Sequence, residues 1–307
     1  MVATTTQPTA TTTTPTPAKP RKRVPPGLLF VVPFLVAYAM FLIWPVISGL
    51  WMSFFNNSLT GSAGEFVGLQ NWQEVFNDSA VWTSLWHTLY FTLLSTPPLV
   101  ILGLGMALLT NMALPATWLW RMSFFAPFLL PASVVALIWV WIYQPGFGLI
   151  NGALSAMGFQ QLGWLTDPDI AMISIVITTV WWTVGFNFLL YLAGLQSIPQ
   201  DVYDAASVDG ANGWSRLWRI TIPMLNPITG LVIALQALSS LRVFDQIYLM
   251  TQGGPNFSTR PVLEYVYDIG FTDFRIGYAS AISYLFFAII LIVSITQFKL
   301  MPTRAED

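Results

Sequence analysis

Long apolar stretches alternate with short polar connections along almost the whole chain. A helix that crosses a bilayer needs about twenty predominantly apolar residues. Six stretches are long enough, and they lie at residues 28–54, 84–110, 119–143, 170–194, 224–250 and 276–298. The pattern predicts an all-α integral membrane protein with six transmembrane helices in a single membrane domain, residues 28–298.

The composition supports this class and excludes several others. Hydrophobic residues make up 55% of the chain and charged residues only 8%, whereas a soluble domain carries roughly a quarter charged residues. The chain has no cysteine and a single histidine, His87, so a disulfide framework, a thiolate metal site and a histidine-based catalytic site are not expected. No pair of carboxylates has catalytic spacing. We therefore predict no catalytic residue, no metal site and no nucleic-acid partner.

The positions of the basic residues predict the orientation in the membrane. Nine of the twelve lie before the first span, in the second and fourth connections, or after the last span: Lys19, Arg21, Lys22, Arg23, Arg121, Arg216, Arg219, Lys299 and Arg304. The first and third connections carry acidic residues and no lysine or arginine. Basic residues concentrate on the cytoplasmic side of membrane proteins. Both termini and the fourth connection are therefore predicted to be cytoplasmic, in a multi-pass protein of the plasma membrane.

Two terminal segments are expected to lie outside the membrane domain. Residues 1–27 are rich in threonine and proline and end in a basic cluster, which predicts a disordered tail with a basic anchor. The apolar run that follows is too long for a signal peptide and has no small-residue cleavage site. Residues 299–307 are predicted to form a cytoplasmic C-terminal tail.

The fourth connection, within residues 195–223, is the most polar internal part of the chain. Ser197 and Gln200 have capping-box spacing, so a short helix is expected from about residue 200 to 209. Gly210 permits the positive φ that ends such a helix. A second helix is expected to begin near Asn212 and to end at Pro223. The loop is therefore predicted to be a pair of short helices lying under the membrane.

Two interpretations of this helix pair remain open from the residues alone. Its tryptophans are typical of an amphipathic segment anchored at the membrane interface. Its small residues, Ala205, Ala206, Gly210 and Ala211, instead favour close approach of another protein's surface.

The loop resembles the cytoplasmic loop of ABC importer permeases, whose pattern is Glu-Ala-Ala, two residues, Asp-Gly-Ala and then Ile-x-Leu-Pro. The matching positions are Asp204, Ala205, Ala206, Asp209, Gly210, Ala211, Ile220 and Pro223. The chain departs from the pattern at Asp204, Leu217 and Ile222, where the family has Glu, Phe and Leu. Each departure keeps the charge or the apolar character.

Further segments resemble the permeases of carbohydrate importers. They are GLQNW (68–72), RMSFFAPFLLPASVVALIWVWIYQPGFGLIN (121–151), AGLQSIP (193–199) and TQGGPNFSTRPVLEYVYDIGF (251–271). The last is similar to the MalF/UgpA type, the first permease of a heterodimeric pair. The family often has Asn where this chain has His87, so a role for His87 does not carry over.

The resemblance implies a type I ABC importer permease fold and a mechanism. The helix at about 200–209 would be a coupling helix seated on an ATP-binding subunit. Asp204 would make polar contacts there, Ala205 and Ala206 would permit close approach, and Asp209 with Gly210 would form the turn. The implied partners are a second permease subunit, two ATP-binding subunits, an extracytoplasmic sugar-binding protein, the sugar and the lipid bilayer.

No cofactor is expected on this chain. The phosphate-binding motif GxxxxGK[ST] is absent, and none of the three lysines follows a glycine. ATP and magnesium are therefore assigned to the partner ATPase subunits.

Polar and aromatic side chains inside spans are candidates for the substrate pathway, because they are costly in lipid and tend to face a cavity or a partner. The candidates are Trp181, Trp182, Asn187, Tyr191, Gln236, Ser239, Arg242, Asp245, Ser283 and Tyr284. Interfacial aromatic packing, and an ion pair between Arg242 and Asp245, are the alternative explanations. Prolines in the second and third spans indicate bends, for packing or for a central cavity.

The substrate class has a second interpretation. A glycerol-3-phosphate or phosphodiester importer shares these motifs but would need a basic cavity, for which Arg242 alone is little support. An ion-coupled secondary transporter would need buried acidic groups in the middle of its spans. The external connection, 251–276, is expected to be a turn, or a loop that dips toward the pathway or meets the binding protein.

Overall fold

The computed structural model describes residues 26–57, 64–112 and 115–300, so most of the predicted N-terminal tail and residues 301–307 lie outside the described part. The first predicted span is a helical run made of α1 (Pro26–Tyr38), the π-helical η1 (Ala39–Ile43) and α2 (Trp44–Met52). Its segment Phe30–Met52 has a mean hydropathy of 2.3. The chain divides into two units at Ser48 and Gly49, so the boundary between them falls within α2.

A short connection leads into the second span. Strands β1 (Phe55–Asn56) and β2 (Glu65–Phe66) pair antiparallel, and α3 (Gln70–Asn77) follows. Helix α4 (Ser79–Asn111) begins five residues before the predicted start at 84. The reason is a side-chain cap, because Asp78 accepts a hydrogen bond of 2.8 Å from the backbone N–H of Ala80.

The third predicted span is not a straight helix. Helix α5 (Thr117–Phe125) and the 3₁₀ turn η2 (Ala126–Leu129) meet α6 (Ala132–Ile142) at a bend of 97°. Pro131 lies at the bend and has extended backbone angles, since proline supplies no backbone donor and disfavours helix in the residue before it. Helix α7 (Leu149–Ala156) follows, in a connection that the sequence pattern left without structure.

The fourth span is a single helix, α8 (Pro168–Gln196), and it leads into the polar loop. The loop contains α9 (Gln200–Val208), α10 (Gly213–Arg216), the π-helical η3 (Leu217–Thr221) and α11 (Ile222–Met224). The expected pair of helical segments is therefore present.

The fifth predicted span is broken, in contrast to the single span predicted at 224–250. Helix α12 (Asn226–Leu241) ends at Arg242, and α13 (Asp245–Thr251) begins three residues later. Helix α14 (Val262–Tyr267) and η4 (Asp268–Thr272) lie within the connection at residues 251–276, which therefore contains helical structure instead of a simple turn. Helix α15 (Ile276–Leu300) is the sixth span.

Within the described residues, four helices are long and apolar enough to cross a membrane, or up to six if each bent pair is one span. The bent pairs are Thr117–Leu129 with Ala132–Ile142, and Gly213–Met224 with Asn226–Leu241, the second at 61°. The six predicted spans thus correspond to four helices and two bent pairs, with α13 added after the fifth.

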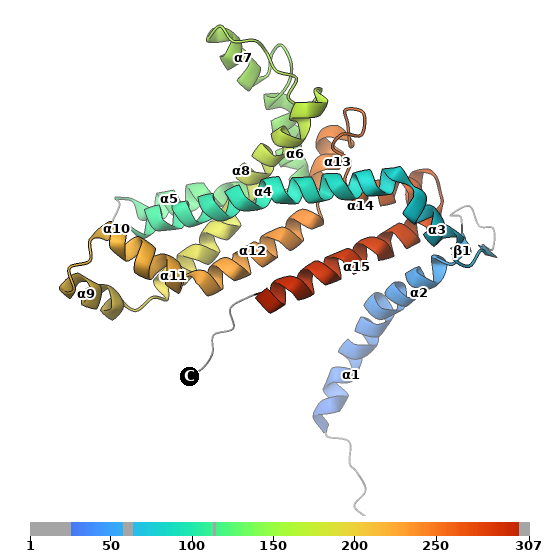
Figure 1. Cartoon of the computed structure of the whole chain (residues 1–307), viewed down its shortest axis with the longest axis horizontal. Helices are drawn as coiled ribbons and strands as arrows, with labels where there is room; N and C mark the ends of the chain where they lie inside the picture. Colours follow the sequence, from blue (N-terminus) through green and yellow to red (C-terminus); the bar gives the residue numbers. More distant parts are fainter. Residues whose placement is uncertain (1–25, 58–63, 113–114, 301–307) are drawn as a thin grey trace, which may run out of the picture. The chain divides into compact units, whose positions relative to one another are not determined.

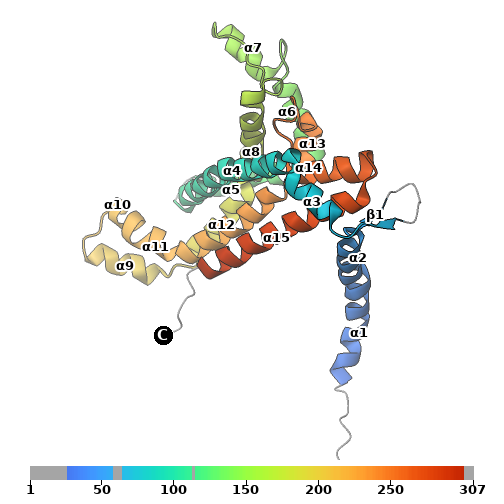
Figure 2. The same ribbon diagram turned by 45° about the vertical axis from the view of Figure 1, so that its right-hand side comes forward.

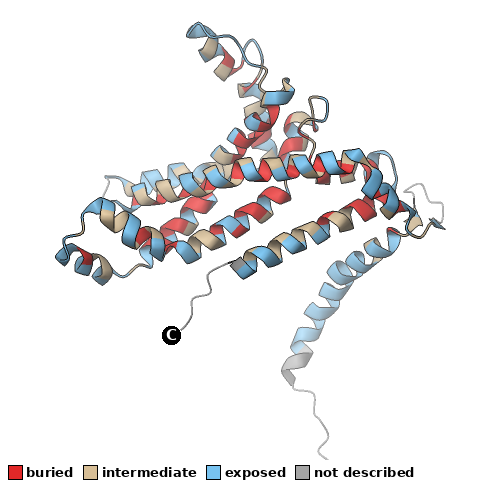
Figure 3. Ribbon diagram, in the orientation of Figure 1, coloured by how far each residue is buried: buried red, intermediate tan, exposed pale blue. Residues whose placement is uncertain are grey.

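Helices α4, α8, α12 and α15 form the body of the second unit, with α4 packed on both α8 and α12 (Figures 1 and 2). Buried residues concentrate on α8 and on the inward faces of α4 and α12 (Figure 3). The α4–α8 contact is close because Gly103 faces Asn187: a Cβ at Gly103 would lie 2.9 Å from the Asn187 Cβ.

A polar cluster joins α3 and α4 to α14 and α15. Asp78 Oδ2 accepts hydrogen bonds from the hydroxyls of Tyr265 (2.5 Å) and Tyr278 (2.6 Å). Burial works to raise the pKa of Asp78, but these hydrogen bonds hold it below its usual value. An ion pair of 2.6 Å between Arg275 and Glu74 lies beside it. The first and fifth connections are therefore held together by charge-assisted hydrogen bonds.

His87 also belongs to this side of the fold. Its Nδ1 atom lies 3.2 Å from the carbonyl oxygen of Arg260. Arg260 in turn stacks over the rings of Phe257 and Tyr265 and lies 3.7 Å from the carboxylate of Asp268. His87 thus contacts the fifth connection, residues 251–276, through Arg260.

Glu264, on α14, is expected to make the stability of the protein depend on pH. Its side chain is buried, with 1% of the residue exposed. Burial raises its pKa to about 7, Asp268 adds to the rise and Arg260 opposes it. The folded chain therefore keeps a proton that the unfolded chain loses as the pH rises from 4.5 toward 7. Stability should fall over this window, by up to about 1.4 kcal/mol per pH unit.

Glu264→Gln should remove that dependence, because the amide cannot titrate. Thermal unfolding of the detergent-purified chain between pH 5 and 8 measures it, and the exposed Glu65→Gln is the matched control. An unchanged slope in the Glu264→Gln variant would show that another group is responsible.

Candidate functional site: a polar cavity and the coupling loop

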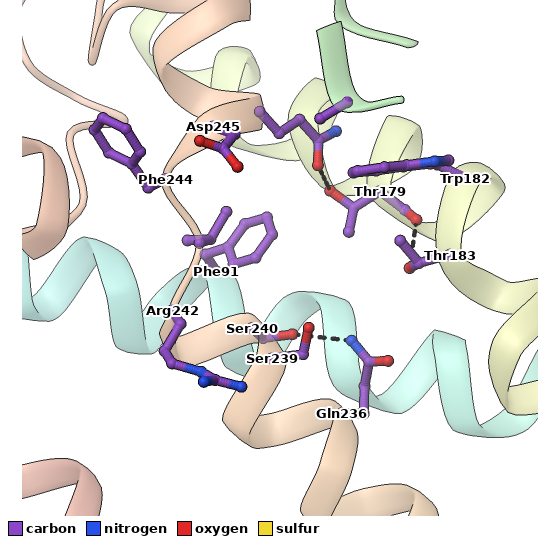
Figure 4. Close-up of a pocket in the computed structure, with 13 residues that line it drawn as sticks. Phe91, Thr179, Trp182, Thr183, Gln236, Ser239, Ser240, Arg242, Phe244 and Asp245 are labelled. Carbon is purple, nitrogen blue, oxygen red and sulfur yellow. Dashed lines mark hydrogen bonds between the residues drawn. The ribbon is translucent and has the colours of Figure 1, made fainter. Parts of the chain in front are cut away.

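A polar cavity of about 190 Å³ lies between α8 and the break that separates α12 from α13 (Figure 4). Its lining residues come from α4, α6, α8, α12 and α13 and the break itself: Phe91, Ala132, Thr179, Trp182, Thr183, Gln236, Ser239, Ser240, Arg242, Val243, Phe244, Asp245 and Gln246. Aromatic rings and hydrogen-bonding groups therefore share one concave surface.

Helix α8 contributes Thr179, Trp182 and Thr183 to the same side, since residues three and four apart share a helix face. Thr179 Oγ1 donates a hydrogen bond of 2.8 Å to Gln246 Oε1, which ties α8 to α13. The indole N–H of Trp182 donates to the carbonyl oxygen of Leu130 at 3.1 Å. These bonds hold the cavity wall in place.

A buried hydrogen-bond chain supports the opposite wall. Asn187 Nδ2 donates to Gln236 Oε1 at 3.1 Å, and Gln236 Nε2 donates to Ser240 Oγ at 3.1 Å. Ser240 Oγ then lies 3.0 Å from Ser95 Oγ. The chain links α8, α12 and α4, so the residues behind the cavity connect its three main helices. Buried polar networks of this kind are strong when their members are partnered.

The two charged residues of the cavity do not pair with each other. Arg242 Nε donates to the carbonyl oxygen of Leu238 at 3.2 Å, and Figure 4 shows the charged ends of Arg242 and Asp245 apart. Ion pairs in the described part of the chain join Arg260 to Asp268 and Arg275 to Glu74. The helix break therefore leaves both charges available to a bound molecule, in contrast to the ion-pair alternative.

Half of the ten predicted pathway residues line the cavity: Trp182, Gln236, Ser239, Arg242 and Asp245. Asn187 and Tyr191 are fully buried behind it. Trp181 lines a separate apolar groove with Trp139 and residues of α4 and α5. Ser283 donates to the Ala279 carbonyl, and Tyr284 lies against Gly49.

Sequence reasoning missed several lining residues, among them Phe91, Thr179, Thr183 and Gln246. The threonines had a signal, because they flank Trp182 at helical spacing on one face. Gln246 had none, since its position depends on where the fifth span breaks.

The polar loop at residues 195–223, the predicted coupling loop, follows from α8 and leads into α12. The turn after α9 has Gly210 at a φ of 78°, as predicted. Asn212 caps α10 by accepting a hydrogen bond of 2.8 Å from the Ser215 N–H. Tyr203 and Thr221 join α9 to η3 through their hydroxyls, 3.2 Å apart.

Two details of the loop differ from expectation. Ser197 bonds the carbonyl oxygen of Gly194 instead of capping α9, for which Pro199 is the N-cap residue. Pro223 does not end the second helical segment, because the helical run Gly213–Met224 continues one residue past it.

Helix α9 presents one exposed face. Asp201, Asp204, Ala205 and Val208 share it by helical spacing, and Val208 is 89% exposed. Ala206 points the other way and is 8% exposed. Asp209 and Gly210 are exposed at the end of the helix, Ala211 is half-buried, and Pro223 is exposed on α11. Val208 is therefore an exposed apolar side chain beside the acidic residues of the same face.

Residues 72–303 match the family described as the inner membrane component of binding-protein-dependent transport systems. The sulfoquinovosyl glycerol transport system permease protein SmoG of Agrobacterium fabrum is 34% identical over 279 residues, covering 91% of each chain. The trehalose/maltose transport system permease protein MalF of Thermococcus litoralis is 37% identical over 284 residues, covering 91% of this chain and 95% of the relative.

A solved structure has the same fold. It is a bacterial ABC transporter involved in the import of the acidic polysaccharide alginate, with a TM-score of 0.77 and 23% identity, covering 90% of this chain and 96% of that chain. The apolar helices, the polar loop between α8 and α12, and these matches lead to one conclusion. The chain belongs to the inner-membrane components of binding-protein-dependent transport systems, the permease subunits of ABC importers.

Proposed function

We propose that this chain carries a sugar across the membrane through the polar cavity, and that α9 couples this movement to ATP hydrolysis on a separate subunit. The observation that carries the proposal is connectivity. Helices α8 and α12 line the cavity, and the coupling loop is the segment that joins them. A movement of α9 is therefore transmitted directly to the cavity walls.

The lining of the cavity fits a sugar. Hydroxyl groups of a sugar need donors and acceptors, which the amides, hydroxyls and the two charged groups provide, and its apolar faces stack on rings such as Trp182 and Phe244. One arginine and one aspartate are its charged residues. A phosphate would need an excess of positive charge, so the glycerol-3-phosphate alternative is less well supported. By their names, the two relatives described above serve the transport of sulfoquinovosyl glycerol and of trehalose and maltose, and UgpA of Yersinia pestis, 29% identical over 279 residues, serves that of sn-glycerol-3-phosphate.

The proposed partners are those of an ABC importer, the class of transporter to which the chain belongs. The chain would pair with a second permease subunit, two ATP-binding subunits and an extracytoplasmic binding protein, with ATP and magnesium held by the ATPase. The chain would cross the membrane six times, with both termini and the coupling loop in the cytoplasm. This orientation is supported by the distribution of basic residues. An ion-coupled transporter has no support in the family to which the chain belongs.

Trp182→Ala should lower sugar transport by the reconstituted importer at least about tenfold, a loss of roughly 1.4 kcal/mol of transition-state stabilisation. The reason is that Trp182 is the indole that faces the cavity. The measurement is binding-protein-dependent uptake over a panel of neutral and phosphorylated sugars.

Trp181→Ala is the matched control, because the neighbouring indole lines the apolar groove instead. Equal losses in the two variants would mean that the polar cavity is not on the pathway. Transport of glycerol-3-phosphate alone would favour the second substrate class.

A further inference from the structure

A second cavity, of about 510 Å³, lies between the coupling loop and the ends of α4 and α8. Its apolar lining consists of Leu108, Met112, Leu195 and Leu217. Its polar lining consists of Asn111, Gln200, Tyr203, Gly213, Arg216 and Thr221. None of these residues lines the polar cavity of the proposed sugar pathway, so the two cavities are separate. The lining of this second cavity is amphipathic.

Arg216 is the charged group of this cavity. It lies over the ring of Tyr203, with 5.8 Å from Cζ to the ring centroid, and Nη1 donates to Ser207 Oγ at 3.3 Å. Both ion pairs in the described residues involve other arginines, so Arg216 has no carboxylate partner there. A cation held by neutral contacts beside apolar walls is complementary to an anion that carries an apolar tail.

The surroundings of the cavity are those of a membrane interface. Trp214 is 70% exposed and Trp218 54% exposed, and tryptophan is enriched at the level of the lipid headgroups. Two more exposed tryptophans, Trp118 and Trp120, lie on α5. Figures 1 and 2 place α10, the C-terminal end of α4 and the start of α5 at the same end of the helix bundle.

The coupling loop is also divided by charge. Its acidic residues, Asp201, Asp204 and Asp209, lie on α9 or just after it, whereas Arg216 and Arg219 lie on α10 and η3. The acidic half suits a protein partner in water. The basic half, with its tryptophans, suits the negatively charged surface of a cytoplasmic leaflet.

We propose that this cavity binds an anionic phospholipid, with the headgroup phosphate at Arg216 and the apolar part against the leucines and Met112. The lipid would hold the α10–η3 half of the loop at the membrane while α9 stays free to engage the ATPase. The proposal rests on the proposed function in one respect. The proposed function places the coupling loop in the cytoplasm, and therefore places this cavity at the cytoplasmic leaflet.

The test is native mass spectrometry of the full-length chain in detergent, titrated with phosphatidylglycerol or with phosphatidylcholine of the same acyl chains. We expect phosphatidylglycerol to bind the tightest site about fivefold more strongly, the preference that one arginine near a membrane surface supplies. Arg216→Gln should lose this preference. Arg219→Gln should keep it, since Arg219 is exposed and does not line the cavity.

A second variant tests the cavity without touching a charge. Gly213 lines it, and a Cβ there would meet no atom within 4 Å, so Gly213→Phe should fill the cavity and abolish the tight site for both lipids. Gly105→Phe is the control. A Cβ at Gly105 also meets no atom within 4 Å, but Gly105 lies on α4 and does not line this cavity.

Three results would overturn the proposal. They are a preference that survives Arg216→Gln, a tight site that survives Gly213→Phe, and displacement of the lipid by equimolar glycerol phosphate, which would indicate a soluble phosphate ligand. Ala205→Trp separates this proposal from the proposed function, because Ala205 is on the exposed face of α9 and does not line the cavity. The variant should disturb ATPase coupling and leave lipid binding unchanged.

Discussion

Gly210→Pro should abolish substrate-stimulated ATP hydrolysis by the assembled importer while the chain still inserts into the membrane. Gly210 has a φ of 78°, and proline is restricted to about −65°. The turn that ends α9 therefore cannot form, and α9 loses its position relative to α10. The change lies in an exposed loop, so the packed helices of the membrane domain are not affected directly.

The measurement is ATPase activity of the reconstituted complex with and without the loaded binding protein. Gly213→Ala is the control in the same loop, because Gly213 does not have a positive φ and has open space for a Cβ. Normal stimulation in Gly210→Pro would show that the conformation of this turn is not needed for coupling.

Asp204→Arg tests the exposed face of α9 by charge instead of by backbone. The carboxylate accepts a hydrogen bond of 3.1 Å from Gln200 and is otherwise free to bind a partner. Reversing its charge should remove the stimulation of ATP hydrolysis by substrate. Polar contacts between Asp204 and the docked ATPase subunit would be replaced by repulsion. Co-purification of the ATPase subunit with the variant measures docking directly. Undiminished co-purification and stimulation would assign docking to other residues.

Gly103→Leu should destabilise the folded chain more than any surface substitution, by about 1–3 kcal/mol or more, the usual effect of overpacking a close contact. A Cβ at Gly103 would lie 2.9 Å from the Asn187 Cβ and 3.2 Å from the Phe188 backbone nitrogen. Backbone atoms cannot move aside as a flexible side chain can, so α4 and α8 must separate. Their separation would also break the hydrogen bond from Asn187 to Gln236.

The comparison is with Gly105→Leu, two residues along the same helix, where a Cβ meets no atom within 4 Å. Thermal unfolding of both variants in detergent should show a lower midpoint for Gly103→Leu alone. Equal midpoints would mean that the helices adjust to the added side chain and that their spacing is not specified by this glycine.

Much of the fold was predictable because membrane spans depend on length and hydropathy. Helices α8 and α15 lie within a few residues of their predicted ranges. The start of α4 was displaced by a local cap at Asp78, which hydropathy does not report. The bend in the third span was indicated by its prolines and lies at Pro131. The break in the fifth span was not predicted, since a continuous apolar run does not reveal where its backbone hydrogen bonds are interrupted.

The coupling loop was predictable for a different reason. Capping residues, glycine and proline act over three or four positions, so the ends of α9 and the turn at Gly210 could be inferred locally. The exposed valine, Val208, was missed, because an apolar residue in a short helix is usually assigned to its buried face. Ala206 is the residue that occupies that buried face.

By itself, the sequence determined that this protein is a multi-helix membrane protein with one polar, helical internal loop. Those properties depend on composition, on charge placement and on motifs within a few residues. The tertiary structure decided which polar residues meet. Thr179 and Gln246 are 67 positions apart and form one wall of the cavity, whereas the adjacent Trp181 and Trp182 face different spaces. A side chain's neighbours depend on helix rotation and on the break before α13, and those follow from packing between distant segments.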